Sequence, residues 1–89
     1  IGMQVTEVRL RSVKGKGKLK ALASVTFDQE LVIRDVRVIE GENGLFVSMP
    51  SRRIKDNEFL DLAFSLTPSL REAIAEAVLK RYFEAAETN

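Results

Sequence analysis

The sequence predicts an α+β fold, in which an antiparallel sheet of four to five strands, connected as a meander, precedes one C-terminal helix. Two observations lead to this prediction. Apolar and polar residues alternate over much of residues 5–49, which is typical of strands with one covered face. From Ser69 to about Ala86 the apolar residues instead recur at spacings of three and four, as they do along one side of a helix.

The first two strands are expected at Val5 to Val13 and at Lys18 to Phe27, where they would pair as an antiparallel hairpin. The Lys14-Gly15-Lys16-Gly17 run interrupts the alternation between them, because glycine adopts turn conformations that other residues resist. A strand follows this run, whereas a phosphate-binding loop of an NTPase would lead into a helix. The run is either a plain hairpin tip or a basic finger that contacts the backbone of a nucleic acid.

A third strand is expected from Leu31 to Ile39, although charged residues interrupt both of its faces. The Gly-Glu-Asn-Gly sequence of residues 41–44 predicts a tight turn. A short fourth strand should then run from Leu45 to Met49 and end at Pro50, because proline lacks the N–H that a central strand requires.

Residues 51–58 are the least regular part of the chain, and we expect them to form an exposed loop. Phe59 to Leu66 has enough apolar residues for a fifth strand. Thr67 and Pro68 predict the start of the helix, with a hydroxyl at the N-cap and proline in the first turn.

The apolar arc of the predicted helix is broader than one small sheet needs to cover. Either the helix packs deeply, or part of the arc meets a second subunit. The arc comprises Leu70, Ile74, Ala77, Val78, Leu79, Tyr82, Phe83 and Ala86.

The chain has 89 residues, which is enough for one domain, expected to span residues 3–89. Ile1 and Gly2 precede Met3, and we expect them to be a remnant added ahead of the native chain. No cysteine or histidine is present, so the chain cannot form disulfides or use thiol chemistry, and it lacks the commonest general base. We therefore expect a protein that is not an enzyme and needs no cofactor, metal or small-molecule substrate.

Acidic residues do not alter this expectation. Asp56, Glu58 and Asp61 are close in sequence, but a site for a hard cation usually supplies more oxygen ligands at tighter spacing. No apolar stretch is long enough to cross a bilayer, and residues 3–20 are too polar for a signal peptide. A cytoplasmic protein without membrane contact is expected.

Charge is distributed unevenly along the chain, although the net charge is only +1. Residues 1–27 hold six Lys/Arg against one acid, residues 28–55 hold five of each sign, and residues 56–89 hold three basic against seven acidic residues. This polarity can create one basic surface that attracts phosphates.

Two groups of basic residues are candidates for contact with nucleic acid. Arg52, Arg53 and Lys55 lie in the expected loop after Pro50, where arginine can make bidentate contacts with phosphates or base edges. The second group is expected on one face of the first two strands, as secondary electrostatic contacts. It comprises Arg9, Arg11, Lys18 and Lys20. Taken alone, both groups are also compatible with ordinary solvated surface. If neither group binds nucleic acid, the surface around Arg34 and Arg37 is the remaining candidate.

Several runs, in order and at matching spacing, resemble the stage V sporulation protein G (SpoVG, septation regulator) family along nearly the whole chain. The runs are Met3-Gln4-Val5-Thr6-Glu7-Val8-Arg9, Lys20-Ala21-Leu22-Ala23-Ser24-Val25-Thr26-Phe27-Asp28, Val36-Arg37-Val38-Ile39-Glu40-Gly41, Gly44-Leu45-Phe46-Val47 and Met49-Pro50-Ser51-Arg52-Arg53. The resemblance implies a homodimeric bacterial regulator that binds DNA and RNA and is linked to sporulation, septation and gene expression. It also implies that Arg52 and Arg53 contact nucleic acid.

The chain departs from the family pattern just after these arginines. Typical members continue Thr-Pro-Asp-Gly where this chain has Ile54-Lys55-Asp56-Asn57, and they have arginine at Leu60 and His-Pro at Phe64-Ser65. These departures imply an altered sequence preference. The alternative function is a protein–protein adaptor in cell division that docks through the acidic helix and its free apolar arc, with nucleic-acid binding incidental.

Overall fold

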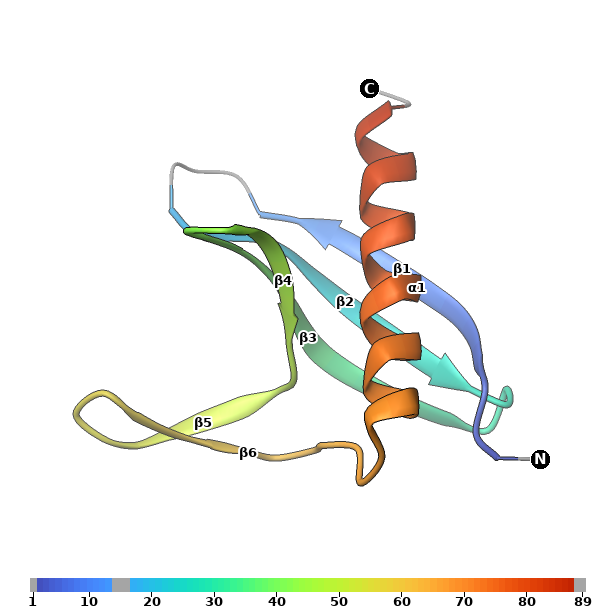
Figure 1. Cartoon of the computed structure of the whole chain (residues 1–89), viewed down its shortest axis with the longest axis horizontal. Coiled ribbons are helices and arrows are strands. Elements are labelled where there is room, and N and C mark those ends of the chain that lie inside the picture. The colour runs from blue at the N-terminus through green and yellow to red at the C-terminus, as the bar shows by residue number, and fades with distance from the viewer. Residues whose placement is uncertain (1, 14–16, 88–89) are drawn as a thin grey trace.

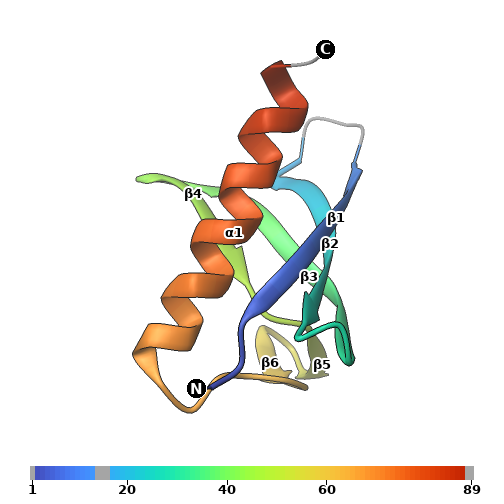
Figure 2. The ribbon, with the colours of Figure 1, turned by 90° about the vertical axis from the view of Figure 1, so that its right-hand side faces the viewer.

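The computed structural model describes residues 2–13 and 17–87, and it confirms the predicted α+β fold. The main sheet is an antiparallel meander of four strands in the order β1-β2-β3-β4, and one helix, α1, lies across one of its faces (Figures 1 and 2). The bounds are Val5–Ser12 for β1, Leu19–Phe27 for β2, Leu31–Gly41 for β3, Gly44–Ser48 for β4 and Pro68–Glu87 for α1. The predicted turn at Lys14, Gly15 and Lys16 lies outside the described residues.

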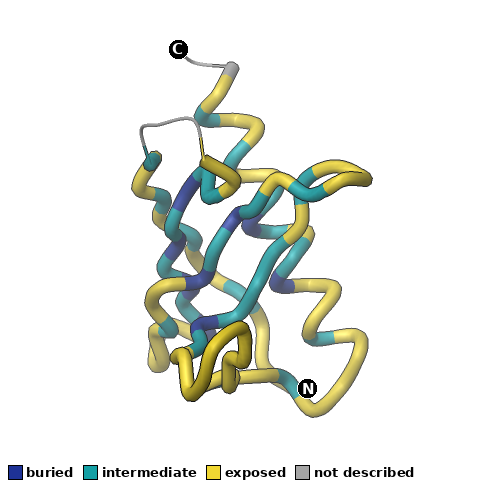
Figure 3. The backbone as a smooth tube through the Cα atoms, turned by 90° about the vertical axis from the view of Figure 1, so that its left-hand side faces the viewer, coloured by how far each residue is buried: buried dark blue, intermediate teal, exposed yellow. Residues whose placement is uncertain are grey.

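The core lies between α1 and the central strands. On β2, Ala21, Ala23, Val25 and Phe27 are all buried, and the residues between them point to the opposite face. Val36 and Val38 of β3 and Ile74 and Val78 of α1 complete this core, which is drawn as the dark blue segments in Figure 3. The period-two alternation of β2 therefore determines which face of the sheet the helix covers.

The turn between β2 and β3 has two residues in the left-handed region, Asp28 with φ 52° and Gln29 with φ 59°. Positive φ at both central positions is the geometry of a type I′ turn, which suits the twist of a hairpin. The N-terminal segment braces this turn. The backbone N–H of Asp28 donates to the carbonyl of Gln4 at 2.9 Å, and that of Gln29 donates to the hydroxyl of Thr6 at 3.1 Å.

The helix begins where the sequence predicts. The hydroxyl oxygen of Thr67 accepts a hydrogen bond from the backbone N–H of Leu70 at 3.3 Å, and Pro68 is the first helical residue. The hydroxyl thus satisfies one of the N–H groups that a helix leaves unpaired at its start.

The sheet covers most of the apolar arc of α1, as the deep-packing alternative requires. Ile74 and Val78 are buried, and Tyr82 packs against the core. Phe83 remains half exposed and meets the ring of Tyr82 edge-on at 5.8 Å between centroids. No helix in residues 2–13 and 17–87 is long and apolar enough to span a membrane.

Residues 52–58 are exposed, as the sequence predicts, but the expectation that residues 51–58 form a loop is wrong. These residues contain β5 (Ser51–Lys55), which pairs with β6 (Glu58–Asp61) in a separate two-stranded sheet. The chain can reverse here because Asn57 has φ 60°, a conformation that asparagine tolerates better than most residues.

The expected fifth strand over Phe59 to Leu66 is also wrong in its length and its partner. Strand β6 ends at Asp61 and does not join the main sheet. The N–H of Leu62 donates to the carbonyl of Pro50 at 2.7 Å, which closes the base of the β5–β6 hairpin. From this base the hairpin, which we call the arm (residues 51–61), extends away from the sheet and helix (Figure 1).

The packing of α1 gives a stability prediction. Ile74→Ala should lower the free energy of unfolding by about 2–5 kcal/mol, because it leaves a cavity between the helix and the sheet. Phe83→Ala, in the same helix but half exposed, should cost less than half as much. Urea unfolding measures both values, and equal losses would contradict the assigned helix face.

Candidate nucleic-acid interface

The sheet face opposite α1, which we call the open face, carries the basic residues of β1. Arg9 pairs across the sheet with Ser24, and Arg11 pairs with Leu22. Ser24 and Leu22 flank Ala23, which is buried beneath the helix, so they and their partners point away from the helix. The structure thus places Arg9 and Arg11 on one surface, as the sequence predicts.

A third arginine joins this surface from β3. Leu22 pairs with Arg11 on one side and with Arg37 on the other, and Arg37 pairs in turn with Ser48 of β4. Because neighbouring strands lie about 4.8 Å apart, Arg11 and Arg37 flank Leu22 at roughly 10 Å from one another.

A β-bulge in β3 adds Arg34 to the open face. The register shifts between Ala23 and Val25 of β2, which pair with Val36 and Ile33 of β3. Arg34 and Asp35 therefore both lie opposite Ser24, and Asp35 takes φ 61° to accommodate the extra residue. From the sequence, Arg34 and Arg37 are only the remaining candidates behind the two predicted basic groups, and the structure places both on the open face.

The open face is hollowed where these residues meet, with a volume of about 350 Å³. The polar and charged lining comprises Arg9, Arg11, Ser24, Arg34 and Asp35. Arg9 forms an ion pair with Glu7 at 3.1 Å, but both side chains are exposed, so the pair holds Arg9 weakly. Within the described part of the chain, Arg11 and Arg34 have no ion-pair partner, which leaves both guanidinium groups available to an anion.

The two lysines of the predicted strand face differ in their surroundings. Lys20 is one-quarter exposed and lies 3.5 Å from a carboxylate oxygen of Glu40, which partly neutralises its charge. Lys18 is exposed and forms no ion pair with any described residue. Lys18 is therefore the more available of the two.

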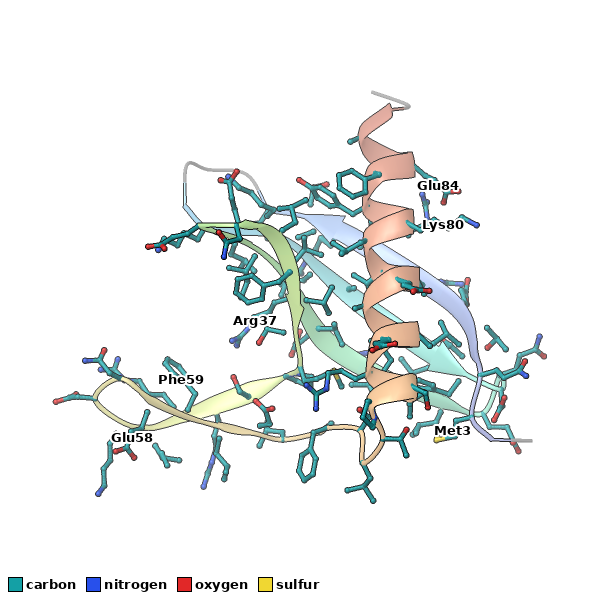
Figure 4. The ribbon with its side chains drawn as sticks, viewed as in Figure 1. Met3, Arg37, Glu58, Phe59, Lys80 and Glu84 are labelled. Atoms are coloured by element: carbon teal, nitrogen blue, oxygen red, sulfur yellow. The ribbon has the colours of Figure 1, made fainter. Side chains whose placement is uncertain are left out.

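The arm presents its basic residues on two opposite faces. Arg52 pairs with Leu60 and Arg53 pairs with Phe59, and successive residues of a strand point to opposite sides. Figure 4 shows Phe59 on the side of the arm that faces Arg37, which we call the inner face, and Glu58 on the outer face. By their pairing, Arg53 shares the inner face with Phe59.

Arg52 and Lys55 share the outer face of the arm, because Lys55 pairs with Glu58. Arg53 forms an ion pair with Asp56 at 3.1 Å and donates from Nε to the carbonyl of Lys55 at 3.4 Å. The expectation that Arg52 and Arg53 lie together in an adaptable loop is thus wrong. Because Arg52 and Arg53 are successive residues of one strand, their side chains point to opposite sides and cannot bind the same phosphate together.

The base of the arm is tied to the open face. The Nη1 of Arg37 donates to the hydroxyl oxygen of Ser51 at 3.4 Å, which is a long hydrogen bond between a half-buried arginine and the first residue of β5. Among the described residues, no group of three or more His, Cys, Asp or Glu could hold a metal ion.

The structure is that of a small α+β protein whose arginines gather on the sheet face that α1 leaves uncovered. Comparison with known proteins gives the family. Residues 3–84 match the SpoVG family, and the chain belongs to it. This confirms the resemblance predicted from the sequence.

Relatives match over most of their length and of this chain. The chain is 53% identical over 85 residues to the "Putative septation protein SpoVG" of Oceanobacillus iheyensis, covering 96% of this chain and 88% of the relative. The protein of the same name from Clostridium acetobutylicum is 51% identical over 80 residues, covering 90% and 84%. That from Caldanaerobacter subterraneus subsp. tengcongensis is 45% identical over 87 residues, covering 98% and 96%. These relatives are named as septation proteins and not as enzymes.

Substitutions at Asp35 test whether the bulge beside Arg34 has the left-handed backbone conformation described above. Alanine is strained at φ 61° and glycine is not, so Asp35→Ala should be less stable than Asp35→Gly by about 1 kcal/mol. Urea unfolding of the two variants gives this difference. An alanine variant as stable as the glycine variant would show that residue 35 does not adopt the left-handed conformation.

Proposed function

We propose that this protein is a non-enzymatic, homodimeric regulator of gene expression that binds DNA or RNA and acts in sporulation and septation. The observation that supports it best is the gathering of Arg9, Arg11, Arg34 and Arg37 on the open face of the sheet. These four residues come from two strands that are not adjacent, and β2 between them contributes only Leu22 and Ser24 at this point. Membership of the SpoVG family and the septation-protein names of the relatives support the cellular role.

The chemistry of the open face suits a phosphate backbone. Guanidinium groups donate paired hydrogen bonds to phosphate oxygens, and a hydroxyl such as that of Ser24 can add another. Arg11 and Arg34 would be the main phosphate contacts, with Arg9 adding charge beside them and Lys18 adding charge at the end of the sheet where β2 begins. Lys20 would contribute less, because Glu40 lies against it.

The outer face of the arm would supply the second contact region. Arg52 and Lys55 lie on it, and neither has an ion-pair partner among residues 2–13 and 17–87. Arg52 can reach base edges as well as phosphates, so it is the residue through which the arm would influence sequence preference. Arg53 lies on the opposite face and would contact the same nucleic acid only after losing its pair with Asp56.

A second candidate function is a protein–protein adaptor in cell division. The observation that favours it is a run of exposed apolar residues over 54–66, the region of the arm and the segment after it. Exposed apolar runs of this kind are typical of protein interfaces.

Two charge-matched double variants test the proposal. Arg11→Ala with Arg34→Ala should weaken binding to a mixed-sequence DNA duplex by roughly tenfold or more at low salt, since hydrogen bonds to charged groups contribute about 1.5–3 kcal/mol each. The slope of log affinity against log salt concentration should fall by about one for each phosphate that the variant no longer neutralises. Fluorescence anisotropy across a salt series measures both quantities for DNA and for RNA.

The matched control is Lys80→Ala with Arg81→Ala, which removes the same charge from exposed positions on α1. In the part of the salt series at about 0.15 M, the control should leave the affinity within about twofold, because the Debye length there is only about 8 Å. Equal losses in both variants would mean that net charge alone matters. A wild-type protein that fails to bind at low salt would overturn the proposal and favour the adaptor.

A further inference from the structure

The arm and the segment that follows it expose an unusual amount of apolar surface. Six large apolar side chains between residues 54 and 66 are between 47% and 90% exposed, and exposed apolar side chains that gather in this way mark interaction surfaces. They are Ile54, Phe59, Leu60, Leu62, Phe64 and Leu66. Figure 3 shows nearly all of the arm in the colour of exposed residues.

The arm is also too small to hold its conformation alone. Its strands have five and four residues, and a two-stranded hairpin without cover is marginally stable in water. Every residue from 52 to 62 is exposed, so neither the main sheet nor the helix buries the arm. A partner that covers one face of the arm would supply the missing stabilisation.

A cleft of about 540 Å³ lies at the base of the arm, between β4 and the first half of α1. The apolar part of its lining is formed by Phe46, Val47, Met49, Phe64, Ile74 and Ala75. Asp61 and Glu72 bring two carboxylates to the same cleft, beside Arg71. The cleft has room for an aromatic side chain, and its acids can pair with a basic residue next to that side chain.

We propose that the arm clasps a second copy of this chain. The arms of two copies lie alongside one another in opposite directions about a two-fold axis, and each arm places its inner face at the cleft of the partner. Phe59 of one copy then packs against the apolar lining of the partner's cleft. Arg53 gives up its exposed ion pair with Asp56 and pairs instead with the carboxylates that line this cleft. The inference rests on the dimer proposed above and does not depend on nucleic-acid binding.

A second copy fits this surface better than an unrelated protein does, because the chain carries both the projecting aromatic side chain and the cleft that can receive it. A two-fold interface uses the same surface on both copies, so that surface must be complementary to itself, as a projection beside a matching recess is. Here Phe59 projects from an arm whose base forms the cleft, so one rotation can satisfy both arms at once. The same arrangement leaves Arg52 and Lys55 on the outer face, free for a nucleic acid.

Single substitutions with matched exposure test the clasp. Phe59→Ser should raise the dissociation constant of the dimer by roughly 30-fold or more, as the loss of an aromatic anchor at the centre of an interface does. Val32→Ser removes an apolar side chain of similar exposure, 51% against 61%, from β3 near the β2–β3 turn and should leave the dimer unchanged. Sedimentation over a concentration series measures both, and circular dichroism confirms that each variant is folded.

Cysteine pairing tests the geometry, since the chain has no cysteine of its own. A chain with Asp56→Cys at the arm tip is mixed with a mass-tagged chain that carries Glu72→Cys at the cleft. Mild oxidation should link the two chains, because each arm tip lies near the partner's cleft. The control replaces Glu72→Cys with Asp28→Cys in the exposed β2–β3 turn, and it should link far less.

Each contrary outcome has a separate meaning. A wild-type chain that stays monomeric at high micromolar concentration would overturn the dimer and the clasp together. If Phe59→Ser remains dimeric, or if the control pair links as well as the test pair, the clasp is wrong and the dimer forms elsewhere. If Phe59→Ser remains dimeric but loses affinity for single-stranded nucleic acid, Phe59 stacks on bases instead. Arg11→Ala with Arg34→Ala should stay dimeric, which separates this test from that of nucleic-acid binding.

Discussion

The packing of one helix against one face of the sheet is the constraint on which the rest of this structure depends. Ala21, Ala23 and Val25 alternate along β2 and lie beneath Ile74 and Val78 of α1. With α1 on one face only, the opposite face has no cover among the described residues, so the alternate positions of the same strands must be compatible with water. Arginines meet this requirement and at the same time give the open face its positive charge.

Two local irregularities then shape the open face and the arm. The bulge at Asp35 adds one residue to β3 and brings Arg34 to the same point as Arg9, opposite Ser24. Pro50, which is buried, separates β4 from β5, and the arm begins directly after it. The regular sheet aligns arginines along its open face. The bulge brings Arg34 close to the other arginines, and the arm adds a second group of basic residues next to the sheet.

Sequence patterns predicted the regular parts of the fold and missed the irregular ones for physical reasons. The alternation of β2 and the Thr67-Pro68 start of α1 follow from local periodicity and capping, which a single sequence displays. The bulge depends on pairing with β2, and strand β5 depends on a reversal at Asn57 that let Arg52 to Lys55 pair with β6. Composition and local patterns do not reveal such pairing, so the sequence predicts Arg34 only as a secondary alternative and places Arg52 and Arg53 in a loop.

The central claim is that nucleic acid binds to the open face of the sheet, and chemical-shift mapping tests it most directly. Titration of the isotope-labelled protein with a short oligonucleotide at low salt should shift the backbone amides of Arg11, Ser24 and Arg34 first and most strongly. Smaller shifts should follow at Arg52 on the arm. Shifts confined to the exposed side of α1, around Glu76 and Lys80, would contradict the claim and place the binding surface on the helix.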